Sequence, residues 1–163
     1  MYGHFGQVFE DEDELAITSR GAGDRAFDMP CLLAVRAGKS VLFMRADELL
    51  RELGQARADH TFEKAFRRYL APDLLILDEF GLRSLNAQQS TDLYELIIAR
   101  HRQSSFAITS NRGVDEWLTL FDDPLLGNSA LDRLANAAHQ LVIEGPSYRA
   151  KLSPKHRPPE DQP

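Results

Sequence analysis

Four consecutive apolar residues, Leu74-Leu75-Ile76-Leu77, lead directly into the acidic pair Asp78-Glu79. A strand with one face in water alternates apolar and polar residues. This run does not alternate, so it predicts a strand that is buried on both faces. Such strands occur in parallel sheets that helices cover on both sides. This one feature therefore restricts the chain to the α/β class of folds.

The rest of the chain alternates short apolar runs with helical patterns, as a parallel sheet covered by helices requires. Asn86 with Gln89 three residues later forms a capping pair that opens a long helix. Further strands are expected at residues 41–44, 105–109 and 140–143, and further helices from residue 47, at 62–70, at 114–121 and at 129–138.

The composition is typical of one soluble globular domain, with 163 residues, 43% apolar and 27% charged. No run approaches the ~20 apolar residues of a membrane span, and the first residues are acidic, unlike a secretion signal. We therefore expect a cytoplasmic protein. Cys31 is the only cysteine and the five histidines share no ligand spacing, which excludes a disulfide and argues against a zinc site.

The net charge of −6 is concentrated at one end of the sequence. Residues 1–30 hold seven acids and two bases, a balance of −5, so the remainder is near neutral and compatible with a polyanionic partner. We expect residues 1–35 to be a divergent, acidic and poorly ordered segment, residues 36–152 to be the folded domain, and residues 153–163 to be a flexible tail.

Asp78 and Glu79 are the strongest candidates for chemistry. Ligands bind at the carboxyl ends of parallel strands, and an apolar strand that ends in two acids has the Walker B form. In that role Asp78 would hold Mg²⁺ directly or through water, and Glu79 would orient or deprotonate an attacking water. Alternatively, the two acids only begin a turn at Phe80-Gly81.

The phosphate-binding loop that usually accompanies a Walker B strand is missing. Its pattern, G-x-x-x-x-G-K-[ST], follows a strand and opens a helix. Gly38-Lys39-Ser40 supplies the last three letters, but Leu33 replaces the first glycine and a predicted strand follows at Val41. We therefore interpret Gly38-Lys39-Ser40 as a simple turn.

Several separate motifs resemble those of the IstB-like transposition helper proteins, which are AAA+ ATPases related to the helicase loader DnaC. The resemblance covers residues 36–151 and implies a three-layer parallel sheet of the P-loop NTPase type. In chain order the motifs are VLF (41–43), ADELL (46–50), DLLILDEFGL (73–82), DLYELI (92–97), ITSNR (108–112), EW (116–117), FDDP (121–124), LDRL (131–134) and GPSYR (145–149).

This resemblance implies roles for four residues, with ATP and Mg²⁺ as cofactors. Asp78 and Glu79 match the Walker B pair, and Asn111 matches the sensor that hydrogen-bonds the attacking water or the γ-phosphate. Arg133 matches the arginine finger that reaches a neighbouring subunit's nucleotide. Alternatively, Asn111 is a polar turn residue and Arg133 a surface arginine that pairs with Asp132 or another acid. The implied partners are a transposase, DNA and further copies of the chain in a homo-oligomer.

Before Val41 the chain departs from this family, whose members carry a first strand and a complete P-loop with its helix. We expect the sheet to be incomplete at the P-loop strand, unless residues 15–18 supply a substitute; residues 31–35 would then be a remnant of the P-loop helix. A decayed or frameshifted copy, altered at the N-terminus, would explain the change. Because Mg²⁺ is held largely through the phosphates of the nucleotide, we expect no independent ATP hydrolysis.

The sequence thus predicts an IstB-like helper of an insertion-sequence transposase with impaired nucleotide binding. Two alternatives remain, a non-catalytic module that assembles with full-length relatives and a DnaC-like helicase loader. Several helical arginines could contact DNA phosphates, although arginines interleaved with acids more often form a solvated surface. These are Arg51, Arg57, Arg67, Arg68, Arg100 and Arg102.

Overall fold

The computed structural model describes residues 14–20, 28–136 and 138–144. At its centre is a five-stranded sheet in the order β2-β3-β4-β1-β5, in which every neighbouring pair is parallel. The strands are β1 (Glu14–Arg20), β2 (Val41–Arg45), β3 (Leu74–Asp78), β4 (Ser105–Ser110) and β5 (Ala138–Glu144).

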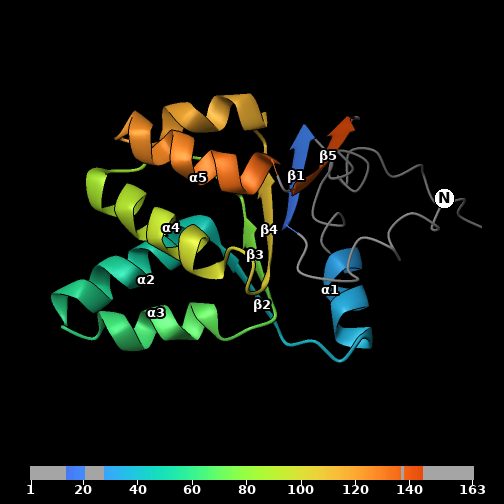
Figure 1. The fold of residues 1–163 in the computed structure, drawn as a ribbon, viewed down its shortest axis with the longest axis horizontal. Helices are drawn as coiled ribbons and strands as arrows, with labels where there is room; N and C mark the ends of the chain where they lie inside the picture. The colour runs from blue at the N-terminus through green and yellow to red at the C-terminus, as the bar shows by residue number, and fades with distance from the viewer. Residues whose placement is uncertain (1–13, 21–27, 137, 145–163) are drawn as a thin grey trace, which may run out of the picture.

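Helices cover the sheet on both faces. Figure 1 shows α2, α3, α4 and α5 on one side and α1 on the other, which confirms the three-layer fold expected from the sequence. No helix of the described residues is long and apolar enough to cross a membrane. The helices are α1 (Asp28–Arg36), α2 (Ala46–Ala58), α3 (Phe62–Leu70), α4 (Ala87–Arg100), the 3-10 helix η3 (Val114–Leu120) and α5 (Pro124–Asn136).

Strand β1 occupies the position at which we expected a gap. It pairs with β4 on one side and with β5 on the other, so that Ile17 lies opposite both Thr109 and Leu141. The expectation of a sheet incomplete at the P-loop strand is therefore wrong, and the suggested substitute at residues 15–18 is confirmed. Its apolar core of three residues, Leu15 to Ile17, is short but sufficient for a strand that hydrogen-bonds on both edges.

The first 35 residues are consequently less irregular than we expected, because they include β1 and nearly all of α1. The helix expected at residues 31–35 is part of α1, which follows β1 in the chain. The remaining N-terminal residues, 1–13 and 21–27, and the expected tail at 153–163 lie outside the described residues.

The Gly38-Lys39-Ser40 segment is the turn between α1 and β2, as we interpreted it. Gly38 has a φ of +75°, and the N–H groups of Gly38 and Lys39 bond back to carbonyls in α1 at 3.0 Å. The Ser40 hydroxyl and N–H donate to the carboxylate of Asp73 at 2.6 and 2.7 Å, which lowers the pKa of Asp73. Asp73 precedes β3, so this turn lies at the amino ends of the strands.

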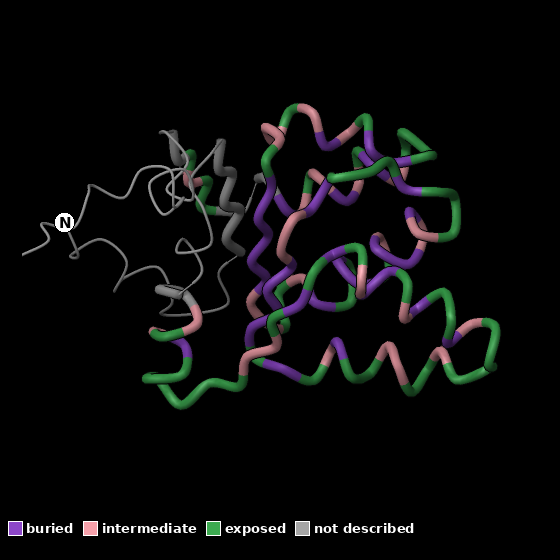
Figure 2. The backbone as a smooth tube through the Cα atoms, turned by 180° about the vertical axis from the view of Figure 1, so that it is seen from behind, coloured by how far each residue is buried: buried purple, intermediate pink, exposed green. Residues whose placement is uncertain are grey.

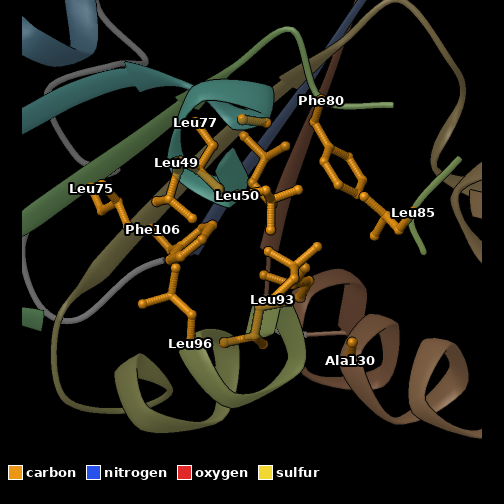
Figure 3. Packing of buried hydrophobic residues seen from close by; sticks show 14 of the residues in the cluster. Leu49, Leu50, Leu75, Leu77, Phe80, Leu85, Leu93, Leu96, Phe106 and Ala130 are labelled. Carbon is orange, nitrogen blue, oxygen red and sulfur yellow. The ribbon is translucent and has the colours of Figure 1, made fainter. Parts of the chain in front are cut away.

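The main core lies between the sheet and α2 to α5. Figure 2 shows the buried backbone concentrated in the central strands and on the inner sides of these helices. On β3, Leu75 and Leu77 belong to this core, whereas Leu74 and Ile76 pack with Ala34 of α1 on the other face. Both faces of β3 are therefore buried, as its unbroken apolar run predicted. Figure 3 shows the main core with Leu49, Leu50, Leu75, Leu77, Phe80, Leu85, Leu93, Leu96, Phe106 and Ala130.

The caps of two helices explain where they begin. Asn86 and Gln89 form the expected capping box of α4, with reciprocal bonds of 2.9 and 3.1 Å. Helix α5 begins at Pro124, earlier than the expected residue 129. Proline suits the first turn of a helix, and the Asp123 carboxylate accepts a 2.8 Å bond from the Leu125 N–H.

Candidate functional site

The candidate site lies at the carboxyl edge of the sheet. Asp78 ends β3, and the Thr109 hydroxyl near the end of the adjacent β4 donates to its Oδ1 at 2.7 Å. Strand β1 follows on the other side of β4, where Thr18 lies opposite Ser110. Because all three strands run in the same direction, the connection from β1 to α1 begins at the same edge as the Asp78 carboxylate.

The turn after Asp78 is fixed by the end of β4. Glu79 has a φ of +56°, in the left-handed region that residues other than glycine seldom adopt. Its N–H donates to the Thr109 hydroxyl at 3.1 Å, and the Phe80 N–H donates to the Thr109 carbonyl at 2.7 Å. The Ser110 hydroxyl donates to the Phe80 carbonyl at 2.7 Å. The acids thus begin a tight turn at the end of a buried strand, and their role as a Walker B pair stays a prediction.

The Glu79 carboxylate is held toward β2. Nη2 of Arg45, the last residue of β2, lies 2.8 Å from Glu79 Oε2, and Nε of Arg45 lies 3.3 Å from Asp47 Oδ1. Strand β2 neighbours β3 on the side opposite β4 and β1. Arg45 therefore draws the Glu79 carboxylate away from the β1–α1 connection. The Arg45 side chain is half exposed, so solvent weakens this ion pair.

A hollow of about 390 Å³ opens beside Glu79 on the β2 side. The first turns of α2 and the 79–85 connection line it, with the charged residues Arg45, Asp47, Arg51, Glu79 and Arg83. Neither Asp78 nor Asn111 contributes to its wall. The hollow is therefore separate from the edge at which the carboxylate pair meets β4.

Asn111 follows directly after β4 and is exposed. It is two residues beyond Thr109, so the fold brings Asn111 to the same edge as Asp78 and Glu79. The next residue, Arg112, donates from Nε to the Gly81 carbonyl at 2.6 Å, which ties the segment after β4 to the acidic turn. The sensor role of Asn111 stays a prediction.

Arg133 does not join this group in the described part of the chain. Its Nη1 donates to the carbonyl and the hydroxyl of Ser129, both at 2.7 Å, one turn earlier in α5. Helix α5 leads into β5, whose first residue, Ala138, lies opposite Glu14 at the amino end of β1. Its role as a finger toward a neighbouring subunit stays a prediction.

Asp78 offers one oxygen of the kind that Mg²⁺ takes, whereas residues 21–27 lack the groups that bind the phosphates of ATP. Mg²⁺ is bound through one or two carboxylates and keeps several waters. Asp78 suits this, because only its Oδ1 has a partner among the described residues. ATP would require a lysine and a Ser or Thr in the connection from β1 to α1. That connection, residues 21–27, reads GAGDRAF and has neither. The described residues also hold no cluster of three or more His, Cys, Asp or Glu for a metal.

Two of the arginines considered for DNA have structural roles. Arg57 donates from Nε at 2.9 Å and from Nη2 at 2.5 Å to Asp92, which is 1% exposed, and its guanidinium lies 3.7 Å from the centroid of the Phe62 ring. Arg100 is itself 1% exposed and donates to four carbonyls. The Arg100 guanidinium is therefore not available to a phosphate, whereas the Arg57 side chain is 34% exposed and its contact with DNA stays a prediction.

Sequence reasoning missed the groups that position the acidic pair, Thr109, Ser110 and Arg45. For Thr109 and Ser110 a signal existed, because two hydroxyl residues end a strand whose middle residues, 106–108, are apolar and buried. A buried hydroxyl needs a partner, and the neighbouring strand offers the carboxylate of Asp78. For Arg45 only its position, directly after an apolar strand, could have suggested a role.

A protein-family model described as "IstB-like ATP binding protein" matches residues 8–156. The match begins well before residue 36, so much of the segment expected to depart from the family lies within it. The chain is 40% identical over 120 residues to "Putative ATP-binding protein Rv3427c in insertion sequence" of Mycobacterium tuberculosis, covering 73% of this chain and 48% of that protein. It is 33% identical over 147 residues to the insertion-sequence ATP-binding protein y4pL of Sinorhizobium fredii, covering 88% and 60%.

The fold is similar to those of solved replication proteins. The DnaC helicase loader superposes with a TM-score of 0.66 at 18% identity, over 83% of this chain and 80% of that one. DnaA bound to AMPPCP and single-stranded DNA superposes with a TM-score of 0.69 at 17% identity, over 86% and 43%. The chain spans about half the length of several of the curated relatives it matches. With the family model matched over most of the sequence, the chain belongs to the IstB-like ATP-binding protein family of insertion sequences.

Proposed function

We propose that the chain is a helper of an insertion-sequence transposase that joins an assembly on DNA and binds ATP poorly by itself. The family supports the first part, because the similar proteins are insertion-sequence ATP-binding proteins. One observation carries the second part. Asp78, Glu79 and Asn111 stand together at the carboxyl edge, yet residues 21–27 contain neither lysine nor Ser or Thr.

The missing residues matter because ATP carries several negative charges close together. In P-loop proteins a lysine neutralises the β- and γ-phosphates, and a Ser or Thr hydroxyl binds Mg²⁺. Backbone N–H groups alone can orient a phosphate but do not cancel its charge. Glu79 also has Arg45 as its counter-ion on the side away from β1. We therefore derive no ATP hydrolysis step for this chain.

The proposed association is tested by recruitment to DNA that carries the transposase of the same insertion sequence. The chain is labelled and titrated into the immobilised transposase–DNA complex, with and without Mg·ATP. We expect saturable capture of the chain. Mg·ATP should change the captured amount less than twofold, because residues 21–27 lack the lysine and hydroxyl groups that would bind its phosphates. No capture by DNA, transposase or their complex would refute the helper role, and ATP-dependent capture would refute poor nucleotide binding.

Arg133 favours a second candidate, a module that supplies an arginine to full-length relatives. Its guanidinium is held by Ser129, and α5 leads toward the amino end of β5 rather than toward Asp78 of the same chain. In a mixed assembly such an arginine could reach only a neighbour's nucleotide.

The module is tested by adding the chain to a full-length relative and measuring ATP turnover. Stimulation of ATP turnover by the unaltered chain but not by Arg133→Ala supports the module. The matched control is Arg67→Ala, an exposed arginine on α3 whose side chain, among the described residues, bonds to a carbonyl of its own helix. Equal stimulation by Arg133→Ala and the unaltered chain would exclude a finger role, and absence of co-assembly would reject the module.

A further inference from the structure

Thr109 contacts both members of the carboxylate pair. The residue is 4% exposed, and its hydroxyl donates to Asp78 Oδ1 at 2.7 Å and accepts from the Glu79 N–H at 3.1 Å. A hydroxyl has one proton, and the Glu79 N–H approaches the oxygen as a donor, so the proton is committed to Asp78. One side chain therefore links the backbone of Glu79 to the carboxylate of Asp78.

The bond to Thr109 determines how the Asp78 carboxylate is presented. A hydroxyl that donates to a carboxylate forms a strong, directional hydrogen bond. With Oδ1 engaged, Oδ2 is the oxygen without a partner among the residues that the structure describes. A carboxylate free to rotate would offer either oxygen in several orientations. The Asp78 carboxylate, held by Thr109, offers one oxygen in one orientation.

The second bond supports an unfavourable backbone conformation. A φ of +56° at Glu79 is unfavourable for a residue other than glycine and persists only where its surroundings enforce it. Thr109 supplies two of the enforcing bonds, its hydroxyl to the Glu79 N–H and its carbonyl to the Phe80 N–H at 2.7 Å. Without the hydroxyl, the N–H of Glu79 would lose its acceptor at this position.

We propose that Thr109 is a positioning residue of this site, which fixes the side-chain rotamer of Asp78 so that Oδ2 meets a divalent cation. Only the last step, the cation, rests on the Walker B role predicted for Asp78 in the proposed family function. Thr109 itself touches neither cation nor nucleotide in this role and acts through Asp78. Partners that orient a metal-binding carboxylate typically change metal affinity about 10- to 100-fold when removed.

Ser110 provides a matched control on the same strand. It is 2% exposed, and its hydroxyl donates to the Phe80 carbonyl at 2.7 Å and accepts from the Arg112 N–H at 3.0 Å. It therefore stabilises the same turn without touching either carboxylate. If Thr109 and Ser110 variants lose stability alike, the loss comes from the shared turn. If only Thr109 variants change the Asp78 side chain, the change shows that Thr109 positions it.

The experiment compares the unaltered chain with Thr109→Val, Thr109→Ser and Ser110→Ala by NMR. Three-bond couplings give the χ1 rotamer of Asp78, and titration with Mn²⁺ alone gives the broadening of the Asp78 amide. We expect one Asp78 rotamer in the unaltered chain, Thr109→Ser and Ser110→Ala, and an averaged rotamer in Thr109→Val. Mn²⁺ broadening at Asp78 should need about tenfold more metal in Thr109→Val, with rescue by Thr109→Ser. If Thr109→Val does not fold, Thr109→Ala removes the hydroxyl without placing a methyl group against the carboxylate.

The two measurements separate this inference from the proposed function. A single Asp78 rotamer in Thr109→Val or Thr109→Ala, or rotamer averaging in the unaltered chain, overturns the positioning role. If Thr109→Val and Ser110→Ala change the Asp78 rotamer to the same extent, the positioning role is overturned as well, because the effect would then come from the turn. If the rotamer is fixed by Thr109 but no variant shows Mn²⁺ broadening at Asp78, the positioning role stands and the proposed cation at Asp78 fails.

Discussion

Replacing Arg100 by methionine should lower the free energy of unfolding by about 3 kcal/mol. Arg100 ends α4 and is 1% exposed, with no carboxylate in contact with it among the described residues. Its guanidinium instead donates to the carbonyls of Tyr69, Leu70, Pro72 and Ser105 at 2.8, 3.4, 3.1 and 2.7 Å. One side chain thus joins the end of α3 to the segments that lead into β3 and β4.

The magnitude follows from two opposing effects. Three of the four bonds are 3.1 Å or shorter, and together such bonds from a charged donor are worth about 6 kcal/mol. Burial opposes them, because it lowers the pKa of Arg100 to about 10, which corresponds to about 3 kcal/mol against the charged form. Methionine keeps the apolar stem and removes both effects, so the difference, about 3 kcal/mol, is lost.

Replacing Arg100 by lysine should make stability depend on pH. An unperturbed lysine has a pKa of about 10.4, and burial at this position would lower that pKa, as it lowers the pKa of Arg100. Between the lowered and the unperturbed pKa the unfolded chain binds more protons than the folded one, so the stability of the variant rises with pH across this window. Below the lowered pKa the lysine is charged in both states and the whole cost of its burial remains.

Urea unfolding followed by circular dichroism measures both variants against the unaltered chain from pH 6.5 to 10. A loss below about 0.5 kcal/mol for Arg100→Met would show that the four carbonyl bonds contribute nothing net. A stability difference between Arg100→Lys and the unaltered chain that does not narrow as the pH rises toward 10 would refute the burial argument.

Three further predictions concern stability, each measured by urea unfolding. Gly81→Ala should lower the free energy of unfolding by about 3 kcal/mol, because the φ of Gly81 is +83° and a Cβ would lie 2.8 Å from Cδ1 of Leu120. Gly38→Ala should lower it by only about 1 kcal/mol, because Gly38 has a φ of +75° but no atom within 4 Å of the added Cβ; equal losses would contradict this. Arg57→Met should lower the free energy of unfolding by about 3 kcal/mol, because it leaves the buried Asp92 carboxylate without its counter-ion. Adding Asp92→Leu should recover most of this stability, and no recovery would argue against the ion pair. Asn86→Ala should cost about 1 kcal/mol through loss of the α4 cap, and an unchanged midpoint would show that the cap is dispensable.

Long patterned segments of the fold could be predicted from the sequence. The unbroken apolar run of β3 correctly indicated a strand buried on both faces, and the Asn86–Gln89 pair located the start of α4. These predictions succeeded because periodicity and capping act locally. The start of α5 was placed too late, since a proline in the first turn reads equally well as part of a preceding turn.

Strand β1 was harder to predict because its stability depends on its neighbours. Only three apolar residues mark it, and its hydrogen bonds come from β4 and β5, which follow it by about 90 and 120 residues. The same limit applies to the site. Asp78 and Glu79 could be named from a strand end and Asn111 from the resemblance to the family, whereas the bonds from Thr109 and Arg45 depend on which strands are adjacent. A sequence pattern does not contain that information.

The account depends most on the claim that the chain keeps the carboxylate pair at the carboxyl edge of the sheet but lacks the lysine and hydroxyl groups that bind the phosphates of ATP. Calorimetric titration of Mg·ATP into the chain and into Asp78→Asn tests it directly. We predict no saturable binding at micromolar concentrations in either protein, because residues 21–27 supply no lysine and no hydroxyl to the phosphates. Micromolar affinity in the unaltered chain that is lost in Asp78→Asn would contradict the claim.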